Sequence, residues 1–371
     1  MTIKKYGLAG CGMMGTEHIN NINLLDGAEI AAVFDPVQAL AGAAASKATD
    51  ATIMGSFEEL VQLESLDAII IASPNNLHID QLEKIISIRN IPILCEKPLY
   101  TKLDDENRLE KLMTKASAPI WVAMEYRYMP PVKAFIERAQ NITGKIEMLT
   151  IREHRFPFLE KVANWNRFNR NTGGTFVEKC CHFFDLMRLI LNAEPIRVSA
   201  SAGQALNHLD ESYEGQTPDI WDSGFAIFDF DNGSRALLEL CMFADGSLWQ
   251  EEITAVGATG KVECRVPGPH RFWPEHLGEQ PNAQLVSSPR MPINPAIEDI
   301  VIDPALKLAG DHHGSTFYQH QRFLKVVNGE AQTEVTLDDG RMAVKMGLAA
   351  QQAALESRVI DLRDEAAENE H

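Results

Sequence analysis

The sequence predicts an α/β protein with two parts: an N-terminal doubly wound parallel sheet of the Rossmann type and a C-terminal α+β domain with a large open, mostly antiparallel sheet. Two observations support this prediction. Up to about residue 125, short apolar runs alternate with helical patterns, which is typical of βαβ units and of a parallel sheet covered on both faces. Beyond Pro131, long strand-like stretches dominate instead. We therefore expect one domain over residues 1–125 and a second over residues 126–371.

The first domain should contain strands and helices in strict alternation. The predicted strands are residues 5–9, 29–34, 68–72, 93–95 and 120–124, and predicted helices between them are residues 36–47, 57–63, 77–88 and 104–115. In such sheets, ligands bind outside the carboxyl ends of the strands. The residues that follow each strand are therefore the first candidates for a site.

The second domain should be dominated by its sheet. The predicted strands are residues 145–156, 197–205, 220–230, 235–243 and 250–256, and the predicted helices are residues 174–191, 313–327 and 340–356. Asp231-Asn232-Gly233-Ser234 between two of these runs is a hairpin signal, so neighbouring strands should be antiparallel. An open sheet of this size needs cover on both faces. We expect a second subunit to cover one face, in a homodimer or homotetramer.

A glycine-rich segment, Gly10-x-Gly12-x-x-Gly15, follows the first predicted strand and opens a helix-compatible stretch. In this pattern the first glycine permits a tight turn, the second lets the backbone approach a pyrophosphate, and the third lets the helix pack on the strand. The helix N-terminus then holds the phosphate charge. An ordinary glycine-rich turn is the alternative, but the strand, the helix and an acid about twenty residues later together favour dinucleotide binding. The candidate cofactor-binding residues here are Gly10, Gly12, Met13, Met14, Gly15 and Asp35.

Asp35 closes the second predicted strand. Its carboxylate would accept hydrogen bonds from the adenosine ribose and repel a 2′-phosphate, so the sequence favours NAD over NADP as the cofactor. Asp35-Pro36 is equally a helix start, with Asp35 as N-cap and Pro36 at the first helical position. The two roles are compatible.

Polar residues also follow two other predicted strands. Ser73-Pro74-Asn75 and His78 come after residues 68–72, and Glu96-Lys97-Pro98 comes after residues 93–95. These segments should converge with the glycine loop at one edge of the sheet. Glu96 either accepts a hydrogen bond from a ribose hydroxyl or pairs with Lys97. The segments add Ser73, Pro74, Asn75, His78, Glu96 and Lys97 to the cofactor-binding candidates.

The composition limits the partners and the compartment. A net charge of −18 argues against nucleic acid and anionic membranes, since both would be repelled. No apolar run approaches the roughly twenty residues that a membrane span needs. The six cysteines are scattered, which favours reduced thiols and a cytoplasmic location.

These motifs, followed by Gly173-Gly174-x-x-x-Glu178-x-x-x-His182-x-x-Asp185, occur in an order that resembles the Gfo/Idh/MocA oxidoreductases, over residues 3–357. The resemblance implies an NAD(P)-dependent dehydrogenase that moves a hydride between the nicotinamide and a secondary alcohol of a sugar, inositol or related polyol. It also implies a catalytic His182 and a cis bond before Pro98. The family pattern usually has Asp where this chain has Glu178.

Three residues are candidates for catalysis. His182 is our candidate proton carrier, because an unperturbed histidine titrates near neutral pH. Glu178 and Asp185 share its face of the predicted helix, where either carboxylate could fix its tautomer. Lys97 precedes a proline at a strand end, which would aim its ammonium into the cleft to polarise the reacting oxygen. Glu178 is equally interpreted as the end of a capping box begun by Thr175.

His182 and Lys97 also have ordinary structural interpretations. His182 could be a packed helix histidine, and Lys97 could be a solvated surface lysine.

Two further functions fit the same motifs. One is a glycosidase of this fold that uses bound NAD for a transient oxidation of the sugar, and the other is a non-catalytic NAD-binding sensor. The presence of both Lys97 and His182 argues against a sensor, which needs no proton relay.

Substrate contacts should come mainly from the second domain, where an aromatic side chain can stack on a sugar and hydrogen-bonding groups reach its hydroxyls. The candidates are Arg127, Arg152, His154, Trp165, Asn166, His182, Asp185, His312 and, by the resemblance, His313. We assign no metal. Asp311-His312-His313-Gly314 and Cys180-Cys181 place possible ligands next to each other in the chain, but adjacent side chains on a regular element diverge.

Overall fold

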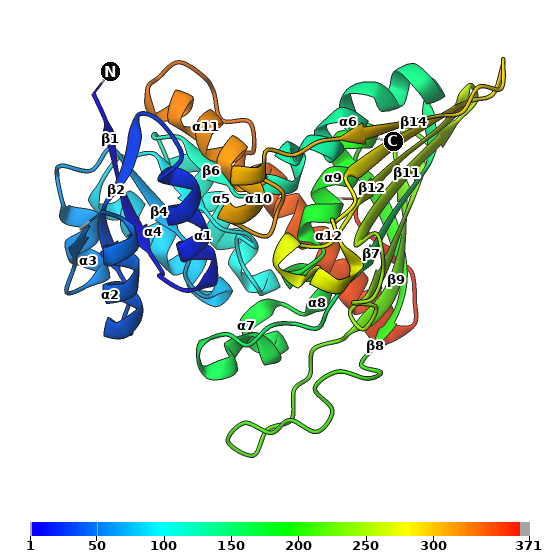
Figure 1. The fold of residues 1–371 in the computed structure, drawn as a ribbon. Helices are drawn as coiled ribbons and strands as arrows, with labels where there is room; N and C mark the ends of the chain where they lie inside the picture. Colours follow the sequence, from blue (N-terminus) through cyan, green and yellow to red (C-terminus); the bar gives the residue numbers. More distant parts are fainter. Residues whose placement is uncertain (1, 50, 364–371) are drawn as a thin grey trace.

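The computed structural model describes residues 2–49 and 51–363, and it contains two sheets with helices packed between them (Figure 1). Residues 1 and 50 and residues 364–371, which end the second predicted domain, lie outside the described residues. The predicted α/β architecture, a doubly wound parallel sheet followed by a large and mostly antiparallel one, is confirmed.

The first sheet has six parallel strands in the order β3-β2-β1-β4-β5-β6. Its strands are β1 (Lys4–Ala9), β2 (Ala28–Phe34), β3 (Thr52–Ile53), β4 (Ala68–Ile71), β5 (Ile93–Cys95) and β6 (Ile120–Val122). The sequence did not predict β3, because this short edge strand exposes both of its side chains and has no apolar run. The carboxyl ends of β1, β2, β4 and β5 share one edge of the sheet.

Helices connect these strands, and a helix from the far end of the chain completes their packing. The connecting helices are α1 (Met13–Ile22), α2 (Gln38–Lys47), α3 (Phe57–Gln62), α4 (His78–Ile88) and α5 (Glu106–Lys115). Helix α11 (Ser315–Val327) lies beside α1, and its Phe323 packs edge-on against Tyr6 and Trp121 (Figure 1). The first core therefore includes side chains from both ends of the sequence.

The second sheet has nine strands in the order β14-β13-β12-β11-β7-β10-β9-β8-β15, and only β7 and β10 pair in parallel. Its strands are β7 (Ile146–His154), β8 (Pro195–Gly203), β9 (Ser223–Phe230), β10 (Arg235–Cys241), β11 (Glu251–Gly257), β12 (Gly260–Val266), β13 (Ala283–Pro289), β14 (Ala296–Ile300) and β15 (Ile360–Asp361). The predicted hairpin joins β9 to β10. Strands β12 to β15 extend the sheet beyond the stretches that the sequence indicated.

Helices cover one face of this sheet, and the other face is open (Figure 1). The helices of this part are α6 (Pro130–Thr143), α7 (Asn169–Thr172), α8 (Thr175–Glu178), α9 (Cys181–Leu191), α10 (Pro304–Ala309) and α12 (Leu337–Glu356). Side chains alternate between the faces, so Ile151 is buried under the helices while Met148, Phe225 and Ile227 are exposed on the open face.

The predicted helix over residues 174–191 is broken. Helix α8 ends at Glu178, α9 begins at Cys181, and Lys179 and Cys180 form the join. Gly174, not Thr175, is the N-cap of α8, and the Thr175 hydroxyl donates to the Trp221 carbonyl at 2.7 Å. The predicted capping box of Thr175 and Glu178 is therefore wrong.

All six cysteines are free thiols. Cys181 packs in the core of the first sheet and Cys180 in the core of the second, so this pair lies where the two cores meet. Among the described residues, no helix has the length and the apolar character that crossing a membrane requires.

Candidate active site

A groove of about 660 Å³ lies at the carboxyl edge of the first sheet. It collects most of the predicted cofactor-binding residues and six residues from the second part of the chain, of which Trp165 and Glu178 were predicted. The predicted residues that line it are Gly10, Gly12, Met13, Met14, Asp35, Ser73, Pro74, Asn75, Glu96, Lys97, Trp165 and Glu178. Gly15 and His78 are not part of its lining.

The glycine loop has the geometry that a pyrophosphate needs. Gly10 has φ +95°, and a Cβ there would lie 2.5 Å from the Ala72 backbone. A Cβ on Gly15 would lie 2.1 Å from the Gly10 carbonyl oxygen, so this residue allows α1 to pack closely. Gly12, the N-cap of α1, meets nothing within 4 Å and opens onto the groove. Free helix-terminal N–H groups beside that space suit a phosphate.

Asp35 is buried and holds the turns on both sides of it. Its Oδ2 accepts a hydrogen bond from the Cys11 amide and its Oδ1 from the Val37 amide, each at 2.8 Å. Helix α2 begins only at Gln38 with Val37 as N-cap, so the predicted N-cap role of Asp35 is wrong. Each carboxylate oxygen retains acceptor capacity for ribose hydroxyls, because it has a second lone pair.

His78 and Glu96 make other contacts than those predicted: His78 lies behind the groove, and Glu96 pairs with a histidine. The ring nitrogens of His78 lie 2.7 Å from the Pro98 carbonyl and 2.9 Å from the Ser73 carbonyl, and the side chain is buried behind both loops. Glu96 does line the groove, but its carboxylate pairs with His18 at 3.0 Å and not with the ammonium of Lys97.

A smaller cavity of about 100 Å³ adjoins the groove. Met13, Met14, Lys97, Lys161 and Glu178 line both spaces, which places the Glu-Lys-Pro segment at their junction. The cavity is further bordered by Glu17, Glu125, Tyr126, Arg155, Asn166, Lys179, His182, Gln250, Asp311 and His312. A small polar molecule in this cavity would therefore contact the predicted catalytic residues.

Lys97 is fixed at this junction by its backbone and by its head group. The Lys97–Pro98 peptide bond is cis. The Lys97 ammonium donates to the Glu178 carbonyl oxygen at 3.0 Å. Burial disfavours the charged form, but Cys181 and the carboxylates of Glu178 and Glu96 outweigh it and raise the pKa of Lys97. The ammonium therefore stays charged at the cavity wall.

Glu178 joins the two parts of the molecule. Its Oε1 pairs with Lys161 at 3.1 Å, and its Oε2 accepts a short hydrogen bond from Asn75. Burial opposes ionisation, but Lys161, Lys97 and Asn75 outweigh it and lower the pKa of Glu178 to about 2. Glu178 is a permanent carboxylate that bonds to Lys161 and Asn75 rather than to His182, so the structure does not support its predicted role in fixing the His182 tautomer.

His182 is buried at the cavity, with its ring parallel to that of Tyr126 at a centroid distance of 4.2 Å. Burial and the nearby ammonium groups of Lys97 and Lys179 lower the pKa of His182 well below its usual value. The imidazole is therefore neutral. Within the described part of the chain, its Nδ1 has no hydrogen-bond partner.

Asp185 does not orient His182 either, because its carboxylate forms an ion pair with Arg127. Arg127 Nε donates to Asp185 Oδ2 at 2.6 Å, and the same guanidinium lies 3.3 Å from Asp339. Neither Arg127 nor Asp185 lines the cavity. This buried ion network ties the segment after β6 to α9 and α12, and the structure does not place Arg127 or Asp185 at the cavity.

Two of the remaining substrate candidates lie on β7, where successive side chains point to opposite faces of the sheet. Arg152 and His154 lie on the open face of the sheet with Glu239, whereas Glu153 between them faces the helices. The structure therefore does not place Arg152 or His154 at the cavity. His313 donates through Nε2 to the Pro267 carbonyl at 2.8 Å and is also outside the cavity lining.

Asn166 and Trp165 remain near the candidate site. Asn166 borders the small cavity, although its Nδ2 donates to the Leu159 carbonyl at 3.0 Å. Trp165 lines the groove with the Lys161 ammonium 4.4 Å from its ring centre. Trp165 is thus placed to contact the cofactor side of the site.

Sequence reasoning missed several cavity residues. Lys179 pairs with Glu153 and donates to the Tyr126 hydroxyl, both at 2.9 Å. Glu125 and Tyr126 come directly after the strand predicted over residues 120–124, so the strand-end rule that located the other loops could have found them. Nothing in the local pattern around Lys161 or Arg155 indicates a site.

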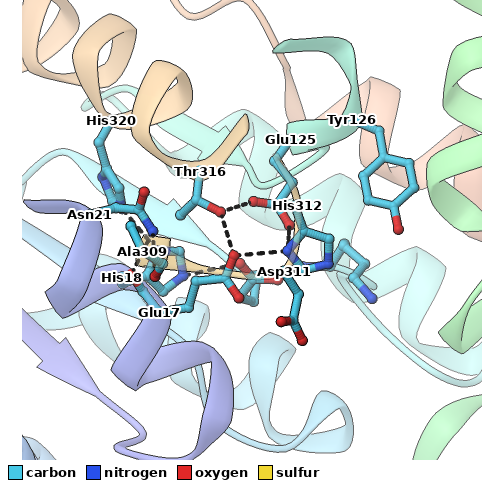
Figure 2. A network of polar contacts seen from close by, with 12 residues as sticks. Glu17, His18, Asn21, Glu125, Tyr126, Ala309, Asp311, His312, Thr316 and His320 are labelled. Atoms are coloured by element: carbon cyan, nitrogen blue, oxygen red, sulfur yellow. Dashed lines mark hydrogen bonds and ion pairs between the residues drawn. The ribbon is translucent and has the colours of Figure 1, made fainter. Parts of the chain in front are cut away.

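Glu17, Glu125, His312 and Thr316 form a polar cluster, and the first three of them border the cavity (Figure 2). His312 Nδ1 lies 2.8 Å from Glu17 Oε1 and 3.2 Å from Glu125 Oε1. The Thr316 hydroxyl lies 3.0 Å from Glu17 Oε1 and makes a short contact with Glu125 Oε2. Burial lowers the pKa of His312, but the carboxylates of Glu125 and Glu17 outweigh it and raise this pKa to about 9.

Comparisons with known proteins place the chain in a family. Residues 4–124 match a model described as the NAD-binding Rossmann fold of an oxidoreductase family, and residues 139–362 match the C-terminal alpha/beta domain of the same family. The rhizopine catabolism protein MocA of Rhizobium meliloti is 25% identical over 74% of this chain and 80% of its own length. Myo-inositol 2-dehydrogenase of Thermotoga maritima is 23% identical over 97% and 99%.

A solved structure shows the same fold. The myo-inositol dehydrogenase from Lactobacillus casei, solved in complex with NAD(H) and myo-inositol, has a TM-score of 0.74 at 19% identity, over 98% of each chain. The chain belongs to the Gfo/Idh/MocA oxidoreductase family, and its first part is an NAD-binding Rossmann domain.

Proposed function

We propose that this oxidoreductase transfers a hydride between NAD and a secondary alcohol carbon of a sugar, inositol or related polyol. The observation that carries the proposal is the junction of groove and cavity, where Lys97 and Glu178 line both spaces and His182 lines the cavity. A relative named as a myo-inositol 2-dehydrogenase supports this substrate class. We assign cofactor binding to residues 1–125, and substrate binding and subunit contacts to residues 126–371.

The groove fits a dinucleotide through the residues already described. The N-terminal turn of α1 with Gly12 would hold the pyrophosphate, and Asp35 would hold the adenosine ribose and favour NAD. The bound nicotinamide supplies the hydride acceptor for oxidation and the hydride donor for reduction.

The chain's own residues then handle charge and protons. The charged ammonium of Lys97 stabilises negative charge that develops on the substrate oxygen. Neutral His182 accepts the hydroxyl proton during oxidation and returns it during reduction. Glu178 is a positioning residue, since its carboxylate holds Asn75 and Lys161 while its carbonyl holds Lys97.

A substrate panel tests this function. Monosaccharides, inositols and sugar acids are incubated with NAD, and NADH formation is followed by absorbance. With a substrate found this way, Lys97→Ala and His182→Ala should each lower kcat/KM by roughly 100-fold or more. His276→Ala, at an exposed histidine outside the cavity, is the matched control.

Two outcomes would count against the proposal. Wild-type activity of both the Lys97 and the His182 variant on every tested sugar would remove their catalytic roles. Cleavage of glycosides with no net NADH would identify the NAD-dependent glycosidase instead.

A further inference from the structure

The small cavity is bordered by a mixed carboxylate–imidazole cluster that the proposed reaction does not use. We propose that Glu17, Glu125 and His312 bind one divalent first-row metal ion, with Zn²⁺ held more tightly than Mn²⁺ and both more tightly than Mg²⁺. One donor atom from each side chain lies within 4.8 Å of the other two. All three side chains border the cavity that contains Lys97 and His182.

The spacing of the donors fits a shared ion. His312 Nδ1 is 2.8 Å from Glu17 Oε1 and 3.2 Å from Glu125 Oε1. Atoms bound to one Zn²⁺ at about 2.1 Å lie roughly 3.0 Å apart in octahedral geometry and about 3.4 Å apart in tetrahedral geometry. These two separations are close to the edges of a coordination polyhedron, and the two carboxylates lie within 4.8 Å of each other.

The fold holds the three ligands in place from separate segments. Glu17 comes from α1, Glu125 lies three residues beyond the end of β6, and His312 lies just before α11 (Figure 2). The side chains of Glu17 and Glu125 are only 8% and 2% exposed. Thr316 contacts both carboxylates and fixes their orientation, as outer-shell partners of metal ligands do.

Hydrogen bonds alone do not satisfy the cluster when both carboxylates are ionised. His312 Nδ1 and the Thr316 hydroxyl carry at most one hydrogen each, yet these two atoms contact carboxylate oxygens in four places. With His312 protonated, two ionised carboxylates leave the buried cluster with one net negative charge, which a further proton or a metal cation balances. A divalent ion displaces the His312 proton, so that two carboxylates and a neutral imidazole balance its charge, and the nitrogen donor favours Zn²⁺ or Mn²⁺ over Mg²⁺.

The ion would have coordination positions left for a substrate. Three protein ligands are the usual number in catalytic zinc sites, where the remaining positions take water or substrate. On the cavity side, those positions would bind neighbouring hydroxyl oxygens of a polyol and orient its carbinol toward Lys97 and His182. This second step rests on the proposed function, whereas binding of the ion does not.

Metal content measures the site directly. The full-length protein is stripped with a chelator, equilibrated with Zn²⁺, Mn²⁺ or Mg²⁺ alone, and analysed by mass spectrometry for bound metal and by thermal denaturation. We expect one Zn²⁺ or Mn²⁺ per chain and a higher Tm with the ion than without it. No bound ion together with an unchanged Tm would overturn the proposal in favour of a protonated carboxylate.

Variants locate the ion. Glu17→Gln, Glu125→Gln and His312→Gln should each weaken binding by about tenfold or more, because each removes a ligand. Asp311→Asn is the matched control: Asp311 borders the same cavity but pairs with Arg271 at 2.6 Å. Circular dichroism of the metal-free variants checks folding, and any one variant that folds is sufficient for the comparison.

The variant outcomes separate the possibilities. Metal retained by the three ligand variants, or lost equally in Asp311→Asn, would place the ion elsewhere and contradict the proposal. A bound ion without effect on any polyol oxidation would leave the site standing and remove only its role in orienting substrate. Failure of every substrate in the panel would refute the proposed function and leave the metal measurement valid.

Discussion

The imidazole of His182 and the phenol ring of Tyr126 are parallel to within 5°, with their centroids 4.2 Å apart. The Tyr126 hydroxyl is in turn held by the Lys179 ammonium at 2.9 Å. No described residue bonds to His182 Nδ1, so stacking rather than a carboxylate orients the ring. The predicted proton carrier is therefore positioned by a contact that the sequence did not reveal.

Removing the stack should slow catalysis more than it weakens substrate binding. Tyr126→Leu is expected to lower kcat by about 2- to 10-fold with a smaller change in KM, because an aromatic pair contributes roughly 0.5–1.5 kcal/mol of orientation energy. Tyr126→Phe keeps the ring and should remain close to the wild type. Steady-state kinetics give kcat and KM for both variants. An equal loss of kcat in Tyr126→Leu and Tyr126→Phe would show that the hydroxyl rather than the stack is important.

Glu251 should make stability depend on pH. Burial and the neighbouring Glu153 raise the pKa of Glu251 from its ordinary 4.5 to about 7. Between these values the native state binds a proton that the unfolded chain has lost, so the free energy of unfolding falls as pH rises through this window. Glu251→Gln cannot ionise and should gain stability over the wild type at pH 8, by roughly 3 kcal/mol at most.

Urea denaturation at pH 5 and pH 8 measures this effect. Glu252→Gln is the matched control, because Glu252 lies on the opposite face of the same strand and pairs with Arg152 at 3.0 Å. An equal gain in the free energy of unfolding for Glu251→Gln at pH 8 and at pH 5 would contradict this prediction.

Asp35 should set the preference between NAD and NADP. Asp35→Asn removes the negative charge at the ribose end of the groove and keeps an acceptor oxygen for only one of the two amides, Cys11 or Val37, that the carboxylate binds. The ratio of kcat/KM for NADP to that for NAD should rise by about tenfold, which equals roughly 1.4 kcal/mol of relieved charge repulsion. An unchanged ratio, measured with a single substrate, would assign Asp35 a purely structural role.

The open sheet face should bind a second copy of the chain. Phe225 and Ile227 of β9 are 52% and 50% exposed there, and Met148 of β7 is exposed on the same face. Large apolar side chains exposed on an open sheet are typical of a subunit interface. Light scattering should give a dimeric or tetrameric mass for the wild type and a smaller mass for Phe225→Asp/Ile227→Asp. A monomeric wild type at micromolar concentration would contradict this prediction.

The sequence predicted the architecture and most of the groove because these depend on local patterns. Strand periodicity and the glycine spacing identified the first sheet, and the strand-end rule found the segment around Lys97. The same reasoning failed for Asp185, because periodicity gives the face of a helix but not the partner, which is Arg127. It also failed for His154, since alternation along β7 turns that side chain to the open face.

The cluster of Glu17, Glu125 and His312 could not be predicted at all. Its members are far apart in the chain. They meet only because α11 packs against α1 and against the segment Glu125–Tyr128. No local motif records such a contact. The predicted divergence of His312 and His313 fits their separate partners, but it did not reveal what His312 contacts.

A crystal structure of the protein with bound NADH would locate the nicotinamide ring relative to Lys97 and His182. We expect the ring at the junction of groove and cavity, in contact with Lys97 and beside the space that His182 borders. A ring bound at a distance from both side chains would contradict this expectation.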